Sequence, residues 1–465
     1  MFRLKPIALV LLLACGSPAV NAANVILIIG DGMDDQQVTI ARNYLKGAQG
    51  RLLLDDMPLR SAVQILTVED TVDERPIYVA DSANTATSLA TGAVTSRGRI
   101  STSAGADQDI PTIVELAAAA GLRSGLVTTA SVTDATPAAF AAHISYRLCE
   151  NPAKMVDITY RDIPLGSCDN DLQAAGGPGS ISEQLAASPL NVLLGGGAKH
   201  FSPQTEDGSG SVLEAARANG FTVLNTREEL ENASPGDRLL GLFSPGTMPV
   251  RLRGEGQRTA QPPQSSVLNR LHHYLGEVTL PEPMTCEPNP DAKGLPSLKA
   301  MTDVALAALS GDNRRGFFLM IESASIDKQS HERKPCGSIG ELQQLNEALA
   351  SALAFANDHP ETLILVTADH SQAAQLVPNG SMFTSYTVPV FTPGMMARIK
   401  TPEGGVMGIN YATNSFAYEE HTGASVPLYG NRVAQGRVPS FVQQRDIFTI
   451  VRDYLGVAPG SALRD

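Results

Sequence analysis

The hydrophobic positions of this chain fall into two alternating kinds of run. Short, uninterrupted runs of Val, Ile, Leu and Phe have the pattern of strands buried on both faces, and the clearest are at 24–29, 125–127, 191–194, 317–321 and 362–366. Between them, apolar residues recur every three or four positions, as on one face of a helix, at 297–309, 340–357 and 442–455. This alternation predicts an α/β fold with a large, mostly parallel central sheet and helices on both faces.

Two stretches lack this periodicity. Residues from about 203 to 291 are rich in Gly, Pro, Ser and Gln, apart from apolar segments at 220–224 and 238–242, and we interpret them as surface elaboration on the sheet. Residues from about 372 to 418 are also irregular and predict a small cap or a subunit interface. We expect the rest of 23–465 to form a single α/β domain.

The first 22 residues have the pattern of an export signal. Arg3 and Lys5 precede an apolar run at 7–14, and small residues at 20–22 form a cleavage site. We therefore expect a cleaved signal peptide and a periplasmic or secreted protein. An alternative is lipoprotein processing, which would leave the chain anchored through Cys15. No later run of about 20 apolar residues predicts a transmembrane helix.

Four cysteines remain outside the signal: Cys149, Cys168, Cys286 and Cys336. An even number in an exported chain indicates two disulfides. Three pairings are possible, and the most local joins Cys149 to Cys168 and Cys286 to Cys336. The alternative is four buried free thiols, which an oxidising compartment disfavours.

The net charge of -13 argues against nucleic-acid binding, which needs a basic surface. It also disfavours a phosphate-bearing ligand, unless bound cations dominate the field at the site.

Polar residues follow three of the predicted strands directly: Asp31, Glu322 and the pair Asp369-His370. Because the carboxyl ends of parallel strands share one edge of a sheet, we expect these side chains to meet there. Asp327 and His331 are spaced to lie on one helical face. Each residue also has an ordinary explanation, as a turn, a helix cap, a surface pair or a loop. Together, the carboxylates and imidazoles have the chemistry of zinc and magnesium ligands.

The segment 79–92, VADSANTATSLATG, consists almost entirely of small side chains. In isolation it predicts a helix capped by Asp81 or Ser82. The other interpretation is that Ser82 is a nucleophile at a helix N-terminus, where anions bind favourably.

The chain resembles bacterial alkaline phosphatases in six motifs, which keep the family's order across most of the mature chain, while about 201–280 match weakly. These motifs are Ile29-Gly30-Asp31-Gly32-Met33, Asp81-Ser82-Ala83, Thr133-Asp134-Ala135-Thr136-Pro137, the ten residues 322–331, Thr367-Ala368-Asp369-His370 and Glu420-His421-Thr422-Gly423.

The resemblance implies two zinc ions and one magnesium ion as cofactors. One zinc would be held by Asp327, His331 and His421, the second by Asp369, His370 and Asp31, and magnesium by Asp31, Thr136 and Glu322, with Asp134 acting through water.

The resemblance also implies hydrolysis of phosphate monoesters through a phosphoserine on Ser82, with Arg147 clamping the phosphate and Lys328 contacting it through water. Without it, Arg147 and Lys328 would be interpreted as solvated surface charges. Small phosphorylated substrates of many kinds and a homodimer are the corresponding expectations.

One nearby position departs from the family pattern: Val94 stands where the family usually has Lys. Asp134 together with Lys328 favours magnesium at the third site. The alternatives are a related phosphodiesterase or an exported protein that binds metal or phosphate without turnover. A sulfatase is disfavoured because the residues after Ser82 lack the Pro and Arg of its modification motif.

Overall fold

Ten strands form one large sheet in the computed structural model, which describes residues 23–160, 163–272, 275–380 and 394–457. All the strands run parallel except β20, which is antiparallel to both of its neighbours. In spatial order they are β21 (Phe441–Gln443), β2 (Leu59–Gln64), β20 (Val426–Gly430), β16 (Thr362–Ala368), β1 (Ala23–Gly30), β15 (Gly316–Ser323), β5 (Arg123–Ser131), β8 (Val192–Gly196), β10 (Leu239–Leu242) and β9 (Thr222–Leu224). The predicted signal peptide and Cys15 lie outside the described residues.

The five strands predicted from apolar runs are all present, and they occupy the middle of this sheet. Every residue of β15 and β16 is buried, as is all of β1 after its first residue. Such strands need cover on both faces, because neither face carries the polar residues that water would solvate.

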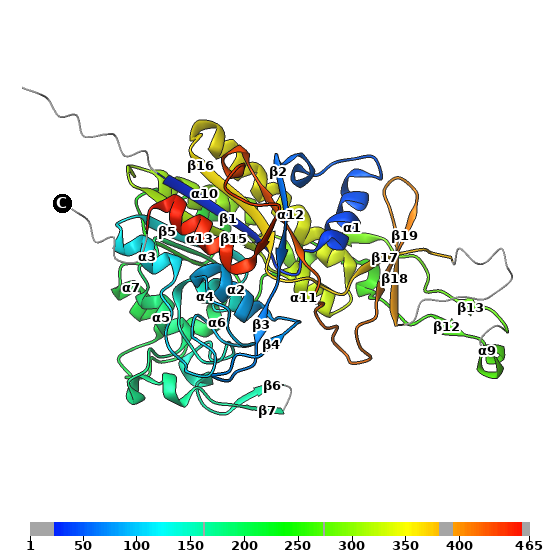
Figure 1. Ribbon diagram of the computed structural model, residues 1–465, viewed down its shortest axis with the longest axis horizontal. Helices are drawn as coiled ribbons and strands as arrows, with labels where there is room; N and C mark the ends of the chain where they lie inside the picture. Colours follow the sequence, from blue (N-terminus) through cyan, green and yellow to red (C-terminus); the bar gives the residue numbers. More distant parts are fainter. Residues whose placement is uncertain (1–22, 161–162, 273–274, 381–393, 458–465) are drawn as a thin grey trace, which may run out of the picture.

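Helices provide that cover in two groups that pack on opposite faces (Figure 1). One group packs around α12 (Pro335–Asp358), together with α1 (Asp35–Lys46) and α10 (Leu298–Ser310). The other comprises α2 (Ser82–Thr91), α3 (Ile113–Ala119), α4 (Ala135–Ala141) and α13 (Gln444–Leu455). The predicted α/β architecture is therefore confirmed.

Helix α12 shows how the sequence pattern becomes packing. It begins with a proline, which fits the first turn because that turn leaves its N–H groups unpaired. Leu342, Leu345 and Leu349 on its predicted stripe are fully buried, and Leu353 is half-buried. The helix starts five residues before the predicted 340, since the expected stripe did not include its small N-terminal residues.

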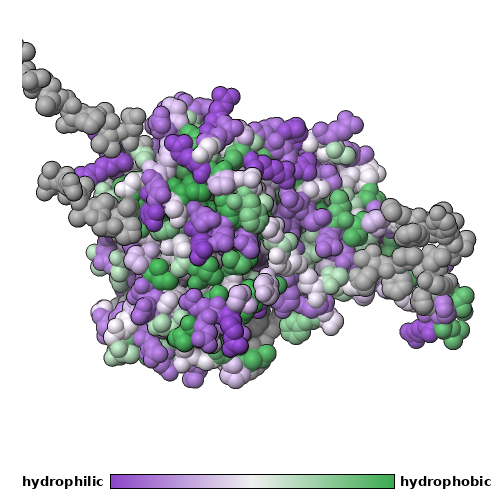
Figure 2. Space-filling model, in the orientation of Figure 1, coloured by the Kyte–Doolittle hydropathy of each residue, from purple (hydrophilic) through white to green (hydrophobic). Residues whose placement is uncertain are grey.

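The region 203–291 only partly matches the expected surface elaboration. Its two apolar segments became β9 and β10, which extend one edge of the central sheet, so interpreting the whole region as surface is too broad. The remainder contains β11 (Leu252–Gly254) paired with β14 (Cys286–Pro288), and an arm that Figure 1 shows projecting from the body. The arm carries β12 (Gln264–Ser265), α9 (Val267–Leu271) and β13 (Val278–Thr279). Apolar residues gather at its tip in Figure 2, where α9 exposes Val267 and Leu271.

The predicted irregular cap is more regular than expected. It contains a three-stranded antiparallel sheet of β17 (Gln375–Val377), β19 (Val406–Tyr411) and β18 (Met395–Lys400). Isolated bridges join β18 to residues 261 and 284, so this small sheet is attached to the base of the arm. Part of the predicted cap, residues 381–393, lies outside the described residues.

Both predicted disulfides are present, in the most local pairing. Cys149 is bonded to Cys168 and Cys286 to Cys336. The second ties β14 to the first turn of α12, which anchors the base of the elaborated region to the main body. Across the described ranges, no helix is both long enough and apolar enough to span a membrane.

Candidate active site

The register of the central strands brings the predicted strand-end residues to one edge. Ile29 of β1 is level with Glu322 of β15 and with Thr367 of β16. Asp31 follows β1 and Asp369 follows β16, so three carboxylates from distant parts of the sequence lie at the same edge of the sheet.

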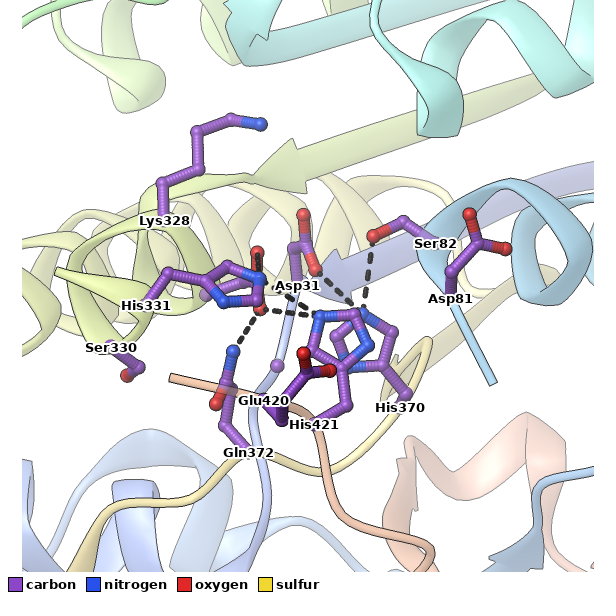
Figure 3. A network of polar contacts seen from close by, with 12 residues as sticks. Asp31, Asp81, Ser82, Lys328, Ser330, His331, His370, Gln372, Glu420 and His421 are labelled. Carbon is purple, nitrogen blue, oxygen red and sulfur yellow. Dashed lines mark hydrogen bonds and ion pairs between the residues drawn. The ribbon is translucent and has the colours of Figure 1, made fainter. Parts of the chain in front are cut away.

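Figure 3 shows the rings of His331 and His421 close together, and both contact Asp327, which lies on α11 (Ser325–His331). The Nε2 atoms of His331 and His421 are each 3.3 Å from an Asp327 carboxylate oxygen and 2.9 Å from each other. Their Nδ1 atoms donate to the backbone carbonyls of Glu419 and Ala80. Because a carbonyl only accepts, each Nδ1 carries a hydrogen, and both Nε2 lone pairs face the same point. This is the arrangement of metal-binding imidazoles.

A second cluster contains Asp31, Asp369 and His370, all almost completely buried. His370 Nε2 lies 3.3 Å from Asp369 Oδ2 and 3.5 Å from Asp31 Oδ1. Burial lowers the pKa of His370 to about 4, so its imidazole is neutral near pH 7 and able to act as a ligand. Burial and the nearby charge of Asp369 raise the pKa of Asp31 well above its usual value.

Asp31 Oδ1 makes no hydrogen bond although it is buried. A buried carboxylate oxygen without a partner is unfavourable, and a cation between Asp31, Asp369 and His370 would satisfy it. The residues present therefore fit a metal ion, because the donors are the nitrogen and oxygen atoms that zinc accepts.

A third group of oxygen donors surrounds Glu322. Its carboxylate accepts hydrogen bonds from the hydroxyls of Thr128 and Thr136. Burial and the charge of Asp134 raise its pKa to about 7. Carboxylate and hydroxyl oxygens of this kind fit magnesium.

The local structure of α2 decides the role of the Asp81-Ser82 pair. Asp81 is the N-cap, and its carboxylate accepts the backbone N–H of Asn84 at 3.1 Å. Ser82 is the first residue of the helix, and its hydroxyl is left for other contacts. Ser82 Oγ lies 3.1 Å from His370 Nε2, as Figure 3 shows. All ten residues of α2 are buried, so its small side chains allow close packing beside the cluster.

Two cations share the carboxylate of Asp134, and one of them also contacts Asp81, the residue before Ser82. Arg147 donates to Asp134 Oδ1 at 3.0 Å and to Asp81 Oδ2 at 3.3 Å, and Lys328 donates to Asp134 Oδ2. Burial alone would raise the pKa of Asp134, but the charges of Lys328 and Arg147 outweigh it, and the pKa falls well below the usual value. The two side chains are about a quarter exposed, so they are accessible to an anion.

Three supporting contacts went unrecognised at the level of sequence. Gln372 donates to Asp327, Thr128 donates to Glu322, and Thr85 donates to Asp369 Oδ2 at 3.5 Å. Gln372 had a usable signal, since it lies two residues after His370, and Thr85 belongs to the hydroxyl-rich segment 79–92. Nothing in the sequence marked Thr128, which lies inside a strand.

Gly32 explains the glycine after Asp31. Its φ of +71° is in the left-handed region, and a Cβ there would lie 2.9 Å from Gln372 Cγ and 3.0 Å from Asp327 Cβ. A larger residue would therefore push apart two side chains of the site.

The predicted residues thus collect at one place, although they come from seven separate segments. The exception to the family pattern, Val94, lies in the loop two residues after Gly92, the C-cap of α2, and is half-buried. Among the described residues, no hydrogen bond or ion pair joins Val94 to these clusters.

Comparisons with known proteins agree on one family. The family model described as alkaline phosphatase matches residues 22–426. Streptomycin-6-phosphate phosphatase of Streptomyces griseus is 40% identical over 446 residues, covering 94% of this chain and 91% of that protein. Alkaline phosphatase of Escherichia coli (strain K12) is 37% identical, covering 94% and 86%. The structure of alkaline phosphatase from the Antarctic bacterium TAB5 superposes with a TM-score of 0.65 at 21% identity, covering 94% of this chain and 100% of that one. The chain therefore belongs to the alkaline phosphatase family of phosphomonoester hydrolases.

Proposed function

We propose that this chain hydrolyses phosphate monoesters in two steps through a phosphoserine on Ser82, assisted by two zinc ions and one magnesium ion. The observation that carries the proposal is the hydroxyl of Ser82, which the Asp81 cap leaves free beside His370 and the metal-binding side chains. We expect many alcohols to be accepted, because the residues around Ser82 recognise the phosphoryl group.

The ligand sets follow the three clusters. Zinc would be held by Asp327, His331 and His421 at one position and by Asp31, Asp369 and His370 at another. Magnesium would be held by Asp31, Thr136 and Glu322, with Asp134 acting through water. When bound, these ions lower the pKa of hydroxyl groups and water and neutralise charge on oxygen atoms. Magnesium in the M3 site of a TAB5 alkaline phosphatase mutant is a parallel in a relative of the same fold.

The reaction uses the chain's own groups as follows. The oxygen of Ser82 attacks phosphorus and its proton passes to a water molecule. The bond between phosphorus and the alcohol oxygen breaks, and the alcohol leaves with a proton returned by that water. Water then attacks the phosphoserine, the bond to Ser82 breaks, and inorganic phosphate is released while Ser82 regains its proton. Arg147 supplies two N–H groups in a fixed fork, which match two phosphoryl oxygens. Holding the phosphate in line with Ser82 contributes to the rate by orientation.

The charges explain why an acidic protein would bind an anion. The five carboxylates of Asp31, Asp134, Glu322, Asp327 and Asp369 outnumber the two cations Arg147 and Lys328. The residues alone would therefore repel a phosphate dianion, and three divalent cations reverse the sign of the site.

Other properties of the chain are proposed with this function. We propose one domain over 23–465, export to the periplasm or the exterior after removal of residues 1–22, and a homodimer. The two disulfides support export, because such bonds persist in oxidising compartments. The name of the Streptomyces griseus relative adds phosphorylated aminoglycosides to the substrates worth assaying.

The direct test is hydrolysis of an aryl phosphate monoester by the metal-loaded protein with and without a chelator. We expect turnover that the chelator abolishes and that Ser82→Ala reduces by at least about a thousandfold. Ser234→Ala, a change at an exposed serine, is the matched control and should keep full activity. Turnover of diesters but not monoesters would instead identify a phosphodiesterase, and metal binding without turnover would identify a binding protein.

A further inference from the structure

A cavity of about 410 Å³ opens beside the proposed phosphoryl site. Its wall includes His331 and Lys328, which also border the metal-binding cluster and Asp134. The rest of the wall comes from Glu332 at the end of α11 and from Phe416, Tyr418 and Glu420. A group bound next to His331 and Lys328 can therefore extend into this cavity without leaving the site.

The segment 413–420 that forms this wall is fixed to α11. Arg333, just after the helix, forms a buried ion pair with Glu419 at 2.7 Å and donates to the backbone carbonyls of Phe416 at 2.9 Å and Ala417 at 3.2 Å. Glu419 in turn donates its N–H to the carbonyl of His331 at 2.9 Å and accepts from His331 Nδ1. The position of the wall is thus coupled to that of a proposed zinc ligand.

Phe416 and Tyr418, here called the aromatic rim, give the cavity an apolar wall. Phe416 is 61% exposed, and its backbone carbonyl accepts a hydrogen bond from Arg333. Covering an exposed aromatic ring with a second flat apolar group is favourable through burial and ring–ring contact. The rim is therefore suited to a ring in the ligand.

Acidic side chains complete the cavity. Glu332 is paired with Lys334, and Glu420 is exposed next to His421 (Figure 3). Lys328 already contacts Asp134. A second negative charge on the ligand would meet these carboxylates without a free cation in the cavity wall, and like charges at short range repel.

We propose that this cavity binds the alcohol portion of the phosphate monoester, and that it favours alcohols with an aromatic or other flat apolar ring and no negative charge. This inference rests on the proposed function. The phosphoryl group would be held at Ser82 and Arg147, while the aromatic rim contacts the ring. Phosphate esters of many alcohols are still hydrolysed, but the rate depends on how the alcohol portion fills the cavity.

The test compares two substrates with similar leaving groups, ethyl phosphate and 2-phenylethyl phosphate. We expect kcat/KM of the wild-type protein to be higher for the phenyl compound, and Phe416→Ala to reduce that ratio by about tenfold. Phe441→Ala removes a phenylalanine that is 54% exposed on β21 and should leave the ratio unchanged. Equal ratios in wild type and Phe416→Ala would overturn the role of the rim.

The charge preference is tested with 2-phenylethyl phosphate and its para-carboxylate derivative. We expect the wild-type protein to have a lower kcat/KM for the para-carboxylate derivative than for 2-phenylethyl phosphate. Glu420→Gln should reduce the ratio of these two kcat/KM values by about threefold. Glu228→Gln, at an exposed residue of α8 (Arg227–Glu231), is the control. An unchanged ratio in Glu420→Gln would contradict the proposed charge preference.

Failure of the proposed function and failure of the alcohol subsite give different results. If neither ethyl phosphate nor 2-phenylethyl phosphate is hydrolysed by the wild-type protein, the proposed function is wrong. If ethyl phosphate is hydrolysed but the phenyl group confers no advantage, only the alcohol subsite is wrong.

Discussion

Two groups of side chains near Ser82 differ in charge: one is rich in carboxylates, and the other contains two cations. On one side, the cluster of Asp31, Asp369 and His370 holds buried negative charge, and the pKa of Asp31 is raised by burial and by its carboxylate neighbours. On the other, Arg147 and Lys328 both contact Asp134, whose pKa is lowered although burial opposes it, and Arg147 also contacts Asp81. The first side holds a buried carboxylate oxygen without a hydrogen-bond partner, whereas on the second side the two cations are paired with carboxylates and remain partly exposed.

This difference shows how one site can bind both metal ions and phosphate. In the proposed function, cations bind on the carboxylate side and a phosphoryl group binds on the cationic side. Ser82 contacts His370 of the first side, and its neighbour Asp81 accepts from Arg147 of the second. A substitution on the carboxylate side is therefore expected to lower both metal content and activity, and a substitution on the cationic side is expected to lower activity alone.

The largest effect should follow a change on the carboxylate side. Asp369→Asn changes a proposed metal ligand at a fully buried position. We expect kcat/KM for an aryl phosphate to fall by about a thousandfold or more and the zinc content, measured by elemental mass spectrometry, to drop. Asp358→Asn, at the exposed end of α12, should change neither. If Asp369→Asn kept its full metal content and activity, the carboxylate side would not be a metal site.

A change on the cationic side should reduce activity and spare the metals. Arg147→Ala removes the fork that faces the phosphoryl group, and we expect a loss of about a hundredfold in kcat/KM. Arg147→Lys should recover part of this loss, because it restores the charge but not the paired N–H groups. The exposed Arg432 provides the control substitution to alanine. A fall in metal content in Arg147→Ala would contradict the assignment of metal binding to the carboxylate side alone.

When metals are removed, Glu322, next to the carboxylate side, and Asp134, on the cationic side, should change the folding stability in opposite directions with pH. Burial raises the pKa of Glu322 from 4.5 to about 7, so the folded protein keeps a proton that the unfolded chain releases. Its contribution to stability therefore decreases as pH rises from 4.5 to about 7, on the order of 2–3 kcal/mol. Asp134, with a lowered pKa, stabilises the fold above its usual value of 3.8 and loses that contribution as pH falls below it.

Urea unfolding of chelated protein across this pH range measures the difference. Glu322→Gln should flatten the decrease between pH 4.5 and about 7, whereas Glu228→Gln should preserve it. A decrease that is equally steep in Glu322→Gln would mean that another group on the carboxylate side carries the proton.

The smallest expected effect is a difference in stability between substitutions at Asp81 and Ser82, the two residues at the start of α2. Asp81→Ala removes the cap and the acceptor for the N–H groups of Asn84 and Gly98, and should cost about 1–2 kcal/mol of unfolding free energy. Ser82→Ala keeps the cap, so we expect its stability to stay within about 0.5 kcal/mol of the wild type. An equal loss in both variants, measured by urea unfolding, would make the hydroxyl of Ser82 structural.

Much of the fold could be predicted from the sequence where burial is continuous. The runs at 24–29, 317–321 and 362–366 became central strands because both of their faces are covered. The short strands β9 and β10 could not be placed, since segments of three or four apolar residues among Gly and Pro have no distinctive period.

The site divides in the same way. Asp31, Glu322 and Asp369 could be grouped because they end neighbouring strands. The choice between Asp81 and Ser82 as the cap could not be made, because both residue types cap helices and only the contact with Asn84 distinguishes them. The wall built by Arg333 and Glu419 was hidden because 86 residues separate the partners, and no local pattern records such a pair.

The central claim is that Ser82 carries the phosphoryl group during turnover. The direct measurement is to mix metal-loaded protein with an isotopically labelled aryl phosphate, quench in acid, and locate the label by peptide mass spectrometry. The account predicts label on the peptide that contains Ser82, at that residue, and none in Ser82→Ala, whose turnover is lost. Label on a different residue, or unchanged turnover by Ser82→Ala, would contradict it.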